Sequence, residues 1–138
     1  MNWKIIIQLS IFGLIMAFAT VSLIPQKIEP AFWLVIFLFC AYAIAKVCNR
    51  QYFLHGFLVS MANCVWLTAV HAVYYKKYTA HHPDVASLGT NILPGGFSVH
   101  PRLAMLIVGP VLGVLFGIIL GLFTLVASKI VNKEKLKV

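Results

Sequence analysis

Acidic residues are the scarcest feature of this 138-residue chain. There are three, Glu29, Asp84 and Glu134, against eleven Lys and Arg, and charged residues make up only 10 % of the whole. None of the three lies inside a long apolar run, which argues against a proton-coupled carrier or a small multidrug exporter built around a buried carboxylate. Hydrophobic residues account for 62 % of the chain, well above the roughly 45–50 % of a soluble domain. The composition excludes a disordered chain and predicts a membrane protein.

Cysteine is also scarce, and its spacing carries little chemistry. The three cysteines, Cys40, Cys48 and Cys64, are odd in number and form no C-x-x-C pair, so a disulfide framework, a zinc knuckle and a thiol oxidoreductase are not indicated. The sequence also contains no G-x-S-x-G, H-E-x-x-H or P-loop motif. We therefore expect a protein that is not an enzyme and that needs no cofactor.

Four apolar runs dominate what is present, and each approaches the roughly 20 residues with which an α-helix crosses about 30 Å of hydrocarbon. They cover residues 5–24, 31–47, 52–74 and 103–127. A longer connection over residues 75–101 follows the third run, whose helix we extend to about His82, and a basic tail covers residues 128–138. These lengths predict one membrane domain over residues 1–138, an all-α bundle of four transmembrane helices.

The surplus of cations serves mainly to orient this bundle. Seven Lys and Arg flank the ends that the two termini share, and four flank the opposite ends, which makes the eleven of the chain. This asymmetry predicts that both termini are cytoplasmic, with a dual-topology dimer as the alternative. The start imitates a signal peptide, with an A-x-A pattern at Ala17 to Ala19, but apolar character continues to Ile24, so we expect a retained first span. We expect no nucleic-acid partner.

The sharpest pattern is a row of glycines in the last span, at Gly109, Gly113, Gly117 and Gly121. A step of four residues turns the helix face by only about 40°, so the row forms a groove without side chains, in the manner of a glycine zipper. A helix that enters such a groove gains close van der Waals contact. That helix belongs either to the same bundle or to a second molecule. Small residues suited to the contact lie in the first span and in the third, at Gly13, Ala17, Gly56 and Ser60.

Polar residues along the third span allow two interpretations. Asn63 occupies the middle of residues 52–74, and Thr68 and His71 lie between it and the outer end. A polar group at that depth needs a partner. We favour an interhelical hydrogen bond, worth about 1 kcal/mol, over the lining of a conduit.

Histidines in the long connection suggest a metal site only weakly. His81, His82 and His100 carry the commonest metal-binding side chain, and Asp84 lies beside them. Adjacent histidines on a helix diverge by about 100°, so His81 and His82 would need an irregular backbone to share one ion. We predict an ordinary polar loop and no bound metal.

The second half of the chain carries a faint family resemblance. The features are His55-Gly56-Phe57 at the start of the third span, Tyr74-Tyr75-Lys76 at its end, and a glycine-rich last span that runs into lysines. With these features the chain resembles uncharacterised four-span bacterial inner-membrane proteins, grouped as a domain of unknown function. The resemblance implies a multi-pass protein of the bacterial inner (plasma) membrane and implies no activity.

Abundant packing residues beside little catalytic chemistry predict a small non-enzymatic membrane protein. Its expected role is that of a structural or accessory subunit that packs through the glycine-rich fourth helix. The alternative is a small channel or transporter with a weakly polar path along the third helix. The expected partners are the lipid bilayer and either a second copy of the chain or another membrane subunit.

Overall fold

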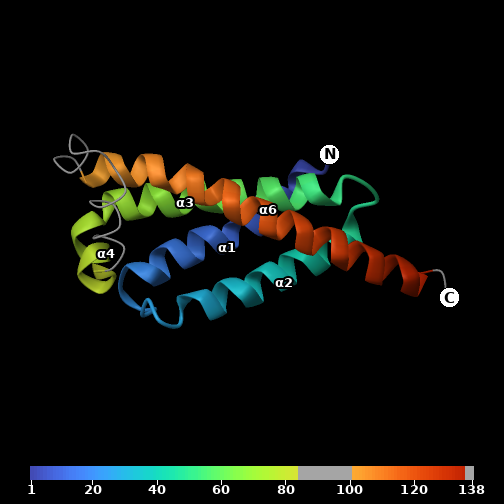
Figure 1. Cartoon of the computed structure of the whole chain (residues 1–138), viewed down its shortest axis with the longest axis horizontal. Coiled ribbons are helices and arrows are strands. Elements are labelled where there is room, and N and C mark those ends of the chain that lie inside the picture. Colours follow the sequence, from blue (N-terminus) through green and yellow to red (C-terminus); the bar gives the residue numbers. More distant parts are fainter. Residues whose placement is uncertain (84–100, 136–138) are drawn as a thin grey trace.

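The computed structural model describes residues 1–83 and 101–135, and the regular structure in these two segments is entirely helical (Figure 1). The helices are α1 (Trp3–Ser22), α2 (Glu29–Val47), α3 (Tyr52–Val73), the short α4 (Tyr75–His81) and the long α6 (Pro101–Lys135). The helices α1, α2 and α3, and the segment Met105–Val131 of α6, are long and apolar enough to cross a membrane. The predictions of an all-α fold and of four transmembrane helices are confirmed.

Residues at the N-terminal ends of the first three helices explain where each helix begins. The Oδ1 atom of Asn2 accepts the N–H of Ile5 at 3.4 Å and caps α1, and Pro30 lies in the first turn of α2, where its missing N–H leaves no bond unmade. Gln51, with φ 57°, turns the chain tightly between α2 and α3. Both α1 and α2 begin two residues earlier than we predicted, at Trp3 and Glu29. The Asn2 cap extends α1 beyond its apolar run. In α2 the extension comes from Glu29, whose negative charge is favourable at the N-terminus of a helix dipole.

The last helix is longer than its apolar run. We predicted its end at residue 127, but α6 continues to Lys135 and includes much of the basic tail. Lys and Glu are good helix formers, so the helix does not need to end where the hydrocarbon ends. Pro110 lies inside α6, and the helix continues on both sides of it.

The end of the third span differs most from the sequence-based expectation. The predicted span over residues 52–74 agrees with α3, which ends at Val73, but the extension of that helix to about His82 is instead a separate α4 that turns across the end of the bundle toward α1 (Figure 1). Tyr74, with φ −94° and ψ 28°, forms the break. The turn buries Tyr78 and His82 to 6 % and 0 % exposure, and a straight helix would have carried both side chains away from the bundle.

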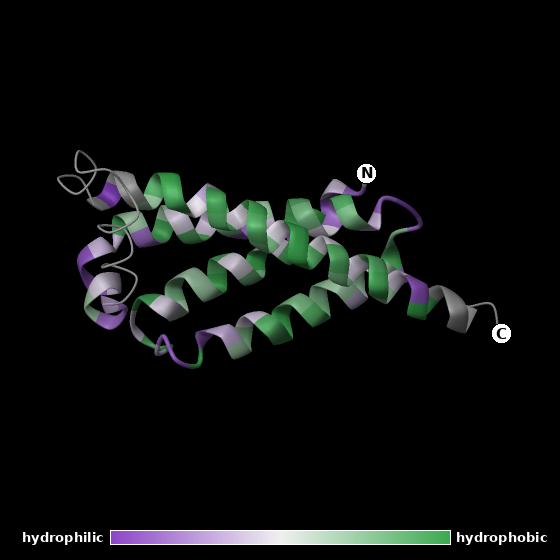
Figure 2. Ribbon diagram, in the orientation of Figure 1, coloured by the Kyte–Doolittle hydropathy of each residue, from purple (hydrophilic) through white to green (hydrophobic). Residues whose placement is uncertain are grey.

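The four spans are arranged so that α3 packs between α1 and α6, while α2 packs mainly on α6. The principal core lies among all four spans and includes Leu9, Ile44, Val59 and Leu120. Large apolar side chains also cover the outside of the spans, and much of each span is coloured green for hydrophobic residues in Figure 2. A soluble protein would keep such a continuous apolar surface covered, so these faces contact the lipid bilayer.

Candidate functional site

Asn63 joins α3 to α1 near the middle of both helices. Its side chain is 2 % exposed, and its Oδ1 atom accepts the backbone N–H of Gly13 at 3.2 Å. A Cβ on Gly13 would lie 2.5 Å from the Cα of Asn63, so the two helices approach this closely only because residue 13 has no side chain. The Nδ2 atom of Asn63 is buried and has no hydrogen-bond partner among the described residues.

The glycine row of α6 faces α3 of the same molecule. A Cβ on Gly113 would lie 2.9 Å from Cys64 Cβ, and one on Gly117 would lie 2.8 Å from Phe57 Cδ2. The other two positions show the same pattern: Gly109 meets the hydroxyl of Thr68, and Gly121 meets the ring of Phe53. Of the two helices that the sequence offered as partners, α3 lies in the groove, and within the described residues α1 does not reach it.

The remaining small residues of the two candidate stripes are buried on different surfaces. A Cβ on Gly56 would lie 2.8 Å from the carbonyl oxygen of Leu120, so Gly56 also serves the contact between α3 and α6. Ala17 is fully buried in a small apolar cluster with Val21 and Val70, between α1 and α3. Ser60 is 3 % exposed. The stripes therefore lie inside the bundle, where they permit close packing.

Hydroxyl and thiol groups strengthen the contact between α3 and α6. The hydroxyl of Thr124 bonds to the carbonyl oxygens of Tyr52 and Gly121 at 2.8 and 2.7 Å. The thiol of Cys64 donates to the carbonyl oxygen of Gly109 at 2.7 Å. Thr68 faces α6 and Asn63 faces α1, so two polar residues of the path that we considered from sequence lie in different helix interfaces.

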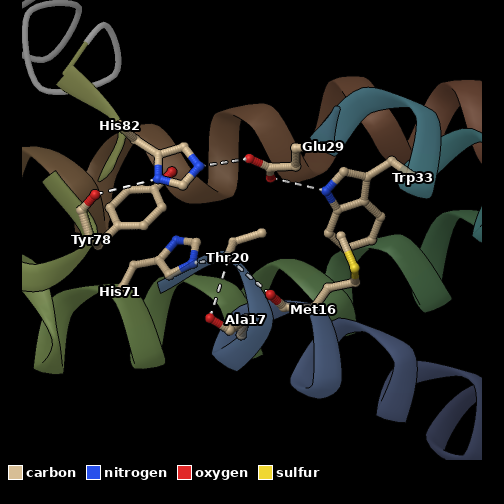
Figure 3. Close-up of polar contacts among 8 residues, drawn as sticks. All are labelled: Met16, Ala17, Thr20, Glu29, Trp33, His71, Tyr78 and His82. Atoms are coloured by element: carbon tan, nitrogen blue, oxygen red, sulfur yellow. Dashed lines mark hydrogen bonds and ion pairs between the residues drawn. The ribbon is translucent and has the colours of Figure 1, made fainter. Parts of the chain in front are cut away.

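A close group of titratable side chains lies at the end of the bundle where α1 ends and α2 begins (Figure 3). The Tyr78 ring of α4 lies between two imidazoles, with its centroid 3.8 Å from that of His71 and 4.6 Å from that of His82. Interplanar angles of 14° and 18° make both contacts stacks. We name His71, Tyr78, His82 and Glu29 the end cluster.

Each end of the stack has a polar partner on another helix. On one side, the Nε2 atom of His71 lies 2.8 Å from the hydroxyl of Thr20 in α1. On the other, Nε2 of His82 lies 3.2 Å from Oε2 of Glu29, whose second oxygen accepts the Trp33 Nε1–H at 3.1 Å. Burial and the nearby Glu29 carboxylate raise the pKa of the Tyr78 phenol, which therefore stays neutral at physiological pH. Four helices thus meet at one cluster.

The structure separates the histidines that we weighed as metal ligands. His81 is exposed and His82 is fully buried, so the adjacent imidazoles point apart and share no ion. His100 lies outside the described residues. Within the described segments no group of three His, Cys, Asp or Glu side chains could hold a metal ion.

Sequence reasoning missed the partner of His82, which is Glu29. The two residues are far apart in the sequence, and no spacing rule joins them. One signal was available, because Glu29 is the only acid next to an apolar run on the outer side that we predicted. An acid in that place needs a counter-charge or a hydrogen-bond donor.

Comparison with known proteins adds no identification. A scan against protein-family models, a search of curated proteins and a search of solved structures each gave no match. Membership of a four-span bacterial inner-membrane family therefore stays a prediction, and the function has to be argued from the residues themselves.

Proposed function

We propose that this chain is a non-enzymatic protein of the bacterial inner membrane that serves as a structural or accessory subunit. The polar side chains of the described spans support this role. Asn63, Thr124 and Cys64 each bond to a neighbouring helix of the same chain. Hydrogen bonds of this kind hold a bundle together and leave few groups for chemistry.

The observation that carries the proposal is that the groove of α6 is already occupied by α3. A partner subunit therefore has to bind elsewhere, on the apolar outer faces. The face of α2 is the richest in exposed aromatic side chains, with Phe32, Phe39 and Tyr42 each about half exposed. Aromatic side chains give interfaces large contact areas at low entropic cost.

A photo-crosslinking amino acid in native membranes tests this role. We would place it at Leu38 on the exposed face of α2, which is 55 % exposed, and, as the matched control, at Ala41 on the buried face of the same helix, which is 2 % exposed. The proposal expects one discrete protein adduct from position 38 and none from position 41. Lipid adducts alone, from position 38 and from other exposed positions on α1 and α6, would contradict it.

A second candidate, a small channel or transporter, has one observation in its favour. The buried Nδ2 atom of Asn63 is a hydrogen-bond donor in mid-span without a partner among the described residues, and a water or a passing solute could accept its bond. Flux through liposomes that contain the purified protein tests this alternative. No movement of a broad panel of ions and small solutes above that in empty vesicles would exclude it.

A further inference from the structure

Both ring nitrogens of His82 face atoms that can only accept a hydrogen bond. The Nδ1 atom lies 3.3 Å from the carbonyl oxygen of Tyr78, and Nε2 lies 3.2 Å from the carboxylate of Glu29. Among the described residues Nε2 makes no aligned hydrogen bond, so its contact with Glu29 is that of an ion pair. A neutral imidazole carries one N–H and an imidazolium carries two, so only the protonated ring turns an N–H toward both oxygens and brings a positive charge to the carboxylate of Glu29.

His82 is buried, and the groups around it determine whether its ring holds the second proton. Its side chain is fully buried, whereas Glu29 keeps 19 % exposure, so the pair meets water only through the carboxylate. The titratable groups that face His82 are Glu29 from α2, Tyr78 from its own helix, and His71 from α3 beyond the Tyr78 ring. Thr20, which reaches the cluster from α1, is uncharged.

These neighbours favour one positive charge in the stack, placed on His82. Glu29 is the only carboxylate at the cluster among the described residues, and it lies on the His82 side. The hydroxyl of Thr20 bonds to the carbonyl oxygen of Met16 at 2.8 Å, and this bond uses its single proton. The Thr20 oxygen is then left to accept the Nε2–H of His71, which a neutral imidazole provides.

We propose that His82 is a proton-binding site and that its bound proton holds α4 against the start of α2. The charged ring joins Glu29 in an ion pair and donates to the carbonyl of Tyr78. When the proton leaves, one of the two contacts becomes a pair of facing acceptors, and the end of the bundle loosens. The hold on α4 therefore depends on whether this proton is bound.

His55, at the opposite end of α3, has the reverse requirement. Its Nε2 atom accepts the backbone N–H of Asn2 at 2.9 Å, and its Nδ1–H donates to the carbonyl oxygen of Gln51 at 2.8 Å. A donor on one side and an acceptor on the other fit the neutral ring and exclude the imidazolium. Of the three histidines that are buried in the described part of the chain, His82 is thus suited to the proton, whereas His55 and His71 are suited to its absence. If the termini are cytoplasmic, the proton-binding end faces the outside.

Nitrogen NMR of the whole protein in lipid nanodiscs tests the proposal. We would label the histidines with ¹⁵N, assign His82 with the His82→Asn variant, and titrate the sample from pH 5 to 8.5. The neighbouring His81 is exposed and provides the internal control, and the Glu29→Gln variant removes the carboxylate at nearly constant size. Amide exchange of α4, corrected for the intrinsic effect of pH, reports how firmly the helix is held.

The expected result is that His82 keeps both N–H groups at a pH where His81 has lost one. In Glu29→Gln this difference should disappear, and α4 should exchange as fast at low pH as the unchanged protein does at high pH. Three results would overturn the proposal: a His82 titration that matches that of His81, a His82 titration that Glu29→Gln leaves unaltered, or protection of α4 that does not change with pH.

Discussion

The backbone N–H of Gly13 donates to the Oδ1 atom of Asn63 over 3.2 Å, at a point where α1 and α3 approach so closely that a Cβ on residue 13 would overlap the Asn63 backbone. In hydrocarbon, helices attract one another by close packing and by hydrogen bonds, because lipid tails are as apolar as the side chains that they would replace. The Gly13–Asn63 contact combines both effects in one place, so its loss should be felt by the whole bundle.

Substitution of Gly13 tests how much this approach contributes. In Gly13→Ala the new methyl group would lie 2.5 Å from the Asn63 backbone, so α1 and α3 must move apart. We expect a loss of about 1–3 kcal/mol in the free energy of unfolding, the usual cost of overpacking. Denaturant unfolding in detergent micelles measures it. Ile15→Leu, on the exposed face of α1, is the control, and an equal effect from both variants would contradict the prediction.

Replacing two glycines of α6 tests the contact with α3. In the double variant Gly113→Leu and Gly117→Leu, the new side chains meet Cys64 and Phe57, and we expect α6 to separate from α3, with loss of the elution peak of the folded protein on size-exclusion chromatography in detergent. The control is Val114→Leu with Ile118→Leu, on the exposed face of the same helix. Normal assembly of the glycine variant would show that the groove is not needed.

Thr124 allows a test of a single hydrogen bond between helices. Thr124→Val keeps the shape of the side chain and removes the hydroxyl that bonds to the carbonyl of Tyr52. We expect a loss of about 0.5–1.5 kcal/mol in the free energy of unfolding. Among the described residues, Ser128 bonds only within its own helix, to the carbonyl of Leu125, so Ser128→Ala is the matched control. Equal losses in both variants would remove the role of Thr124 in joining the helices.

The orientation of the bundle is open to cysteine labelling, but the native Cys48 is a poor reporter. It is 5 % exposed, and burial raises the pKa of its thiol, an effect that the nearby N-terminal amine partly offsets. Because the thiolate is the reactive form, a raised pKa leaves less of it at neutral pH. We expect Cys48 to react with a maleimide more slowly than a cysteine placed at the exposed Asn49.

That exposed position then reports the topology. An impermeant maleimide should leave Asn49→Cys unlabelled in intact cells and label it in opened cells, in a background without Cys48. Lys76→Cys, exposed on α4 at the opposite end of the bundle, should be labelled in intact cells. The reverse pattern would overturn the prediction that both termini are cytoplasmic, and labelling of both positions in intact cells would indicate dual topology.

The number of spans and their approximate limits followed from the sequence because a span is a local property. A run of about 20 apolar residues must cross the bilayer as a helix, whatever lies beside it. The limits were less accurate at Glu29 and at Lys135, where an acidic residue in the first turn and the helix propensity of Lys and Glu extend a helix beyond its apolar run. The sequence also predicted that the glycine row forms a groove for another helix, since a spacing of four places residues on one face of any helix.

The sequence by itself therefore determined four membrane helices, the positions of the small residues and the sites where a polar side chain needed a partner. Only the tertiary structure decided which partner each one has: α3 for the groove of α6, Gly13 for Asn63, and Glu29 for His82. It also decided the break at Tyr74 that carries α4 over the end of the bundle. The reason is physical, since periodicity describes one helix at a time, whereas a contact depends on how two helices are rotated and spaced against each other.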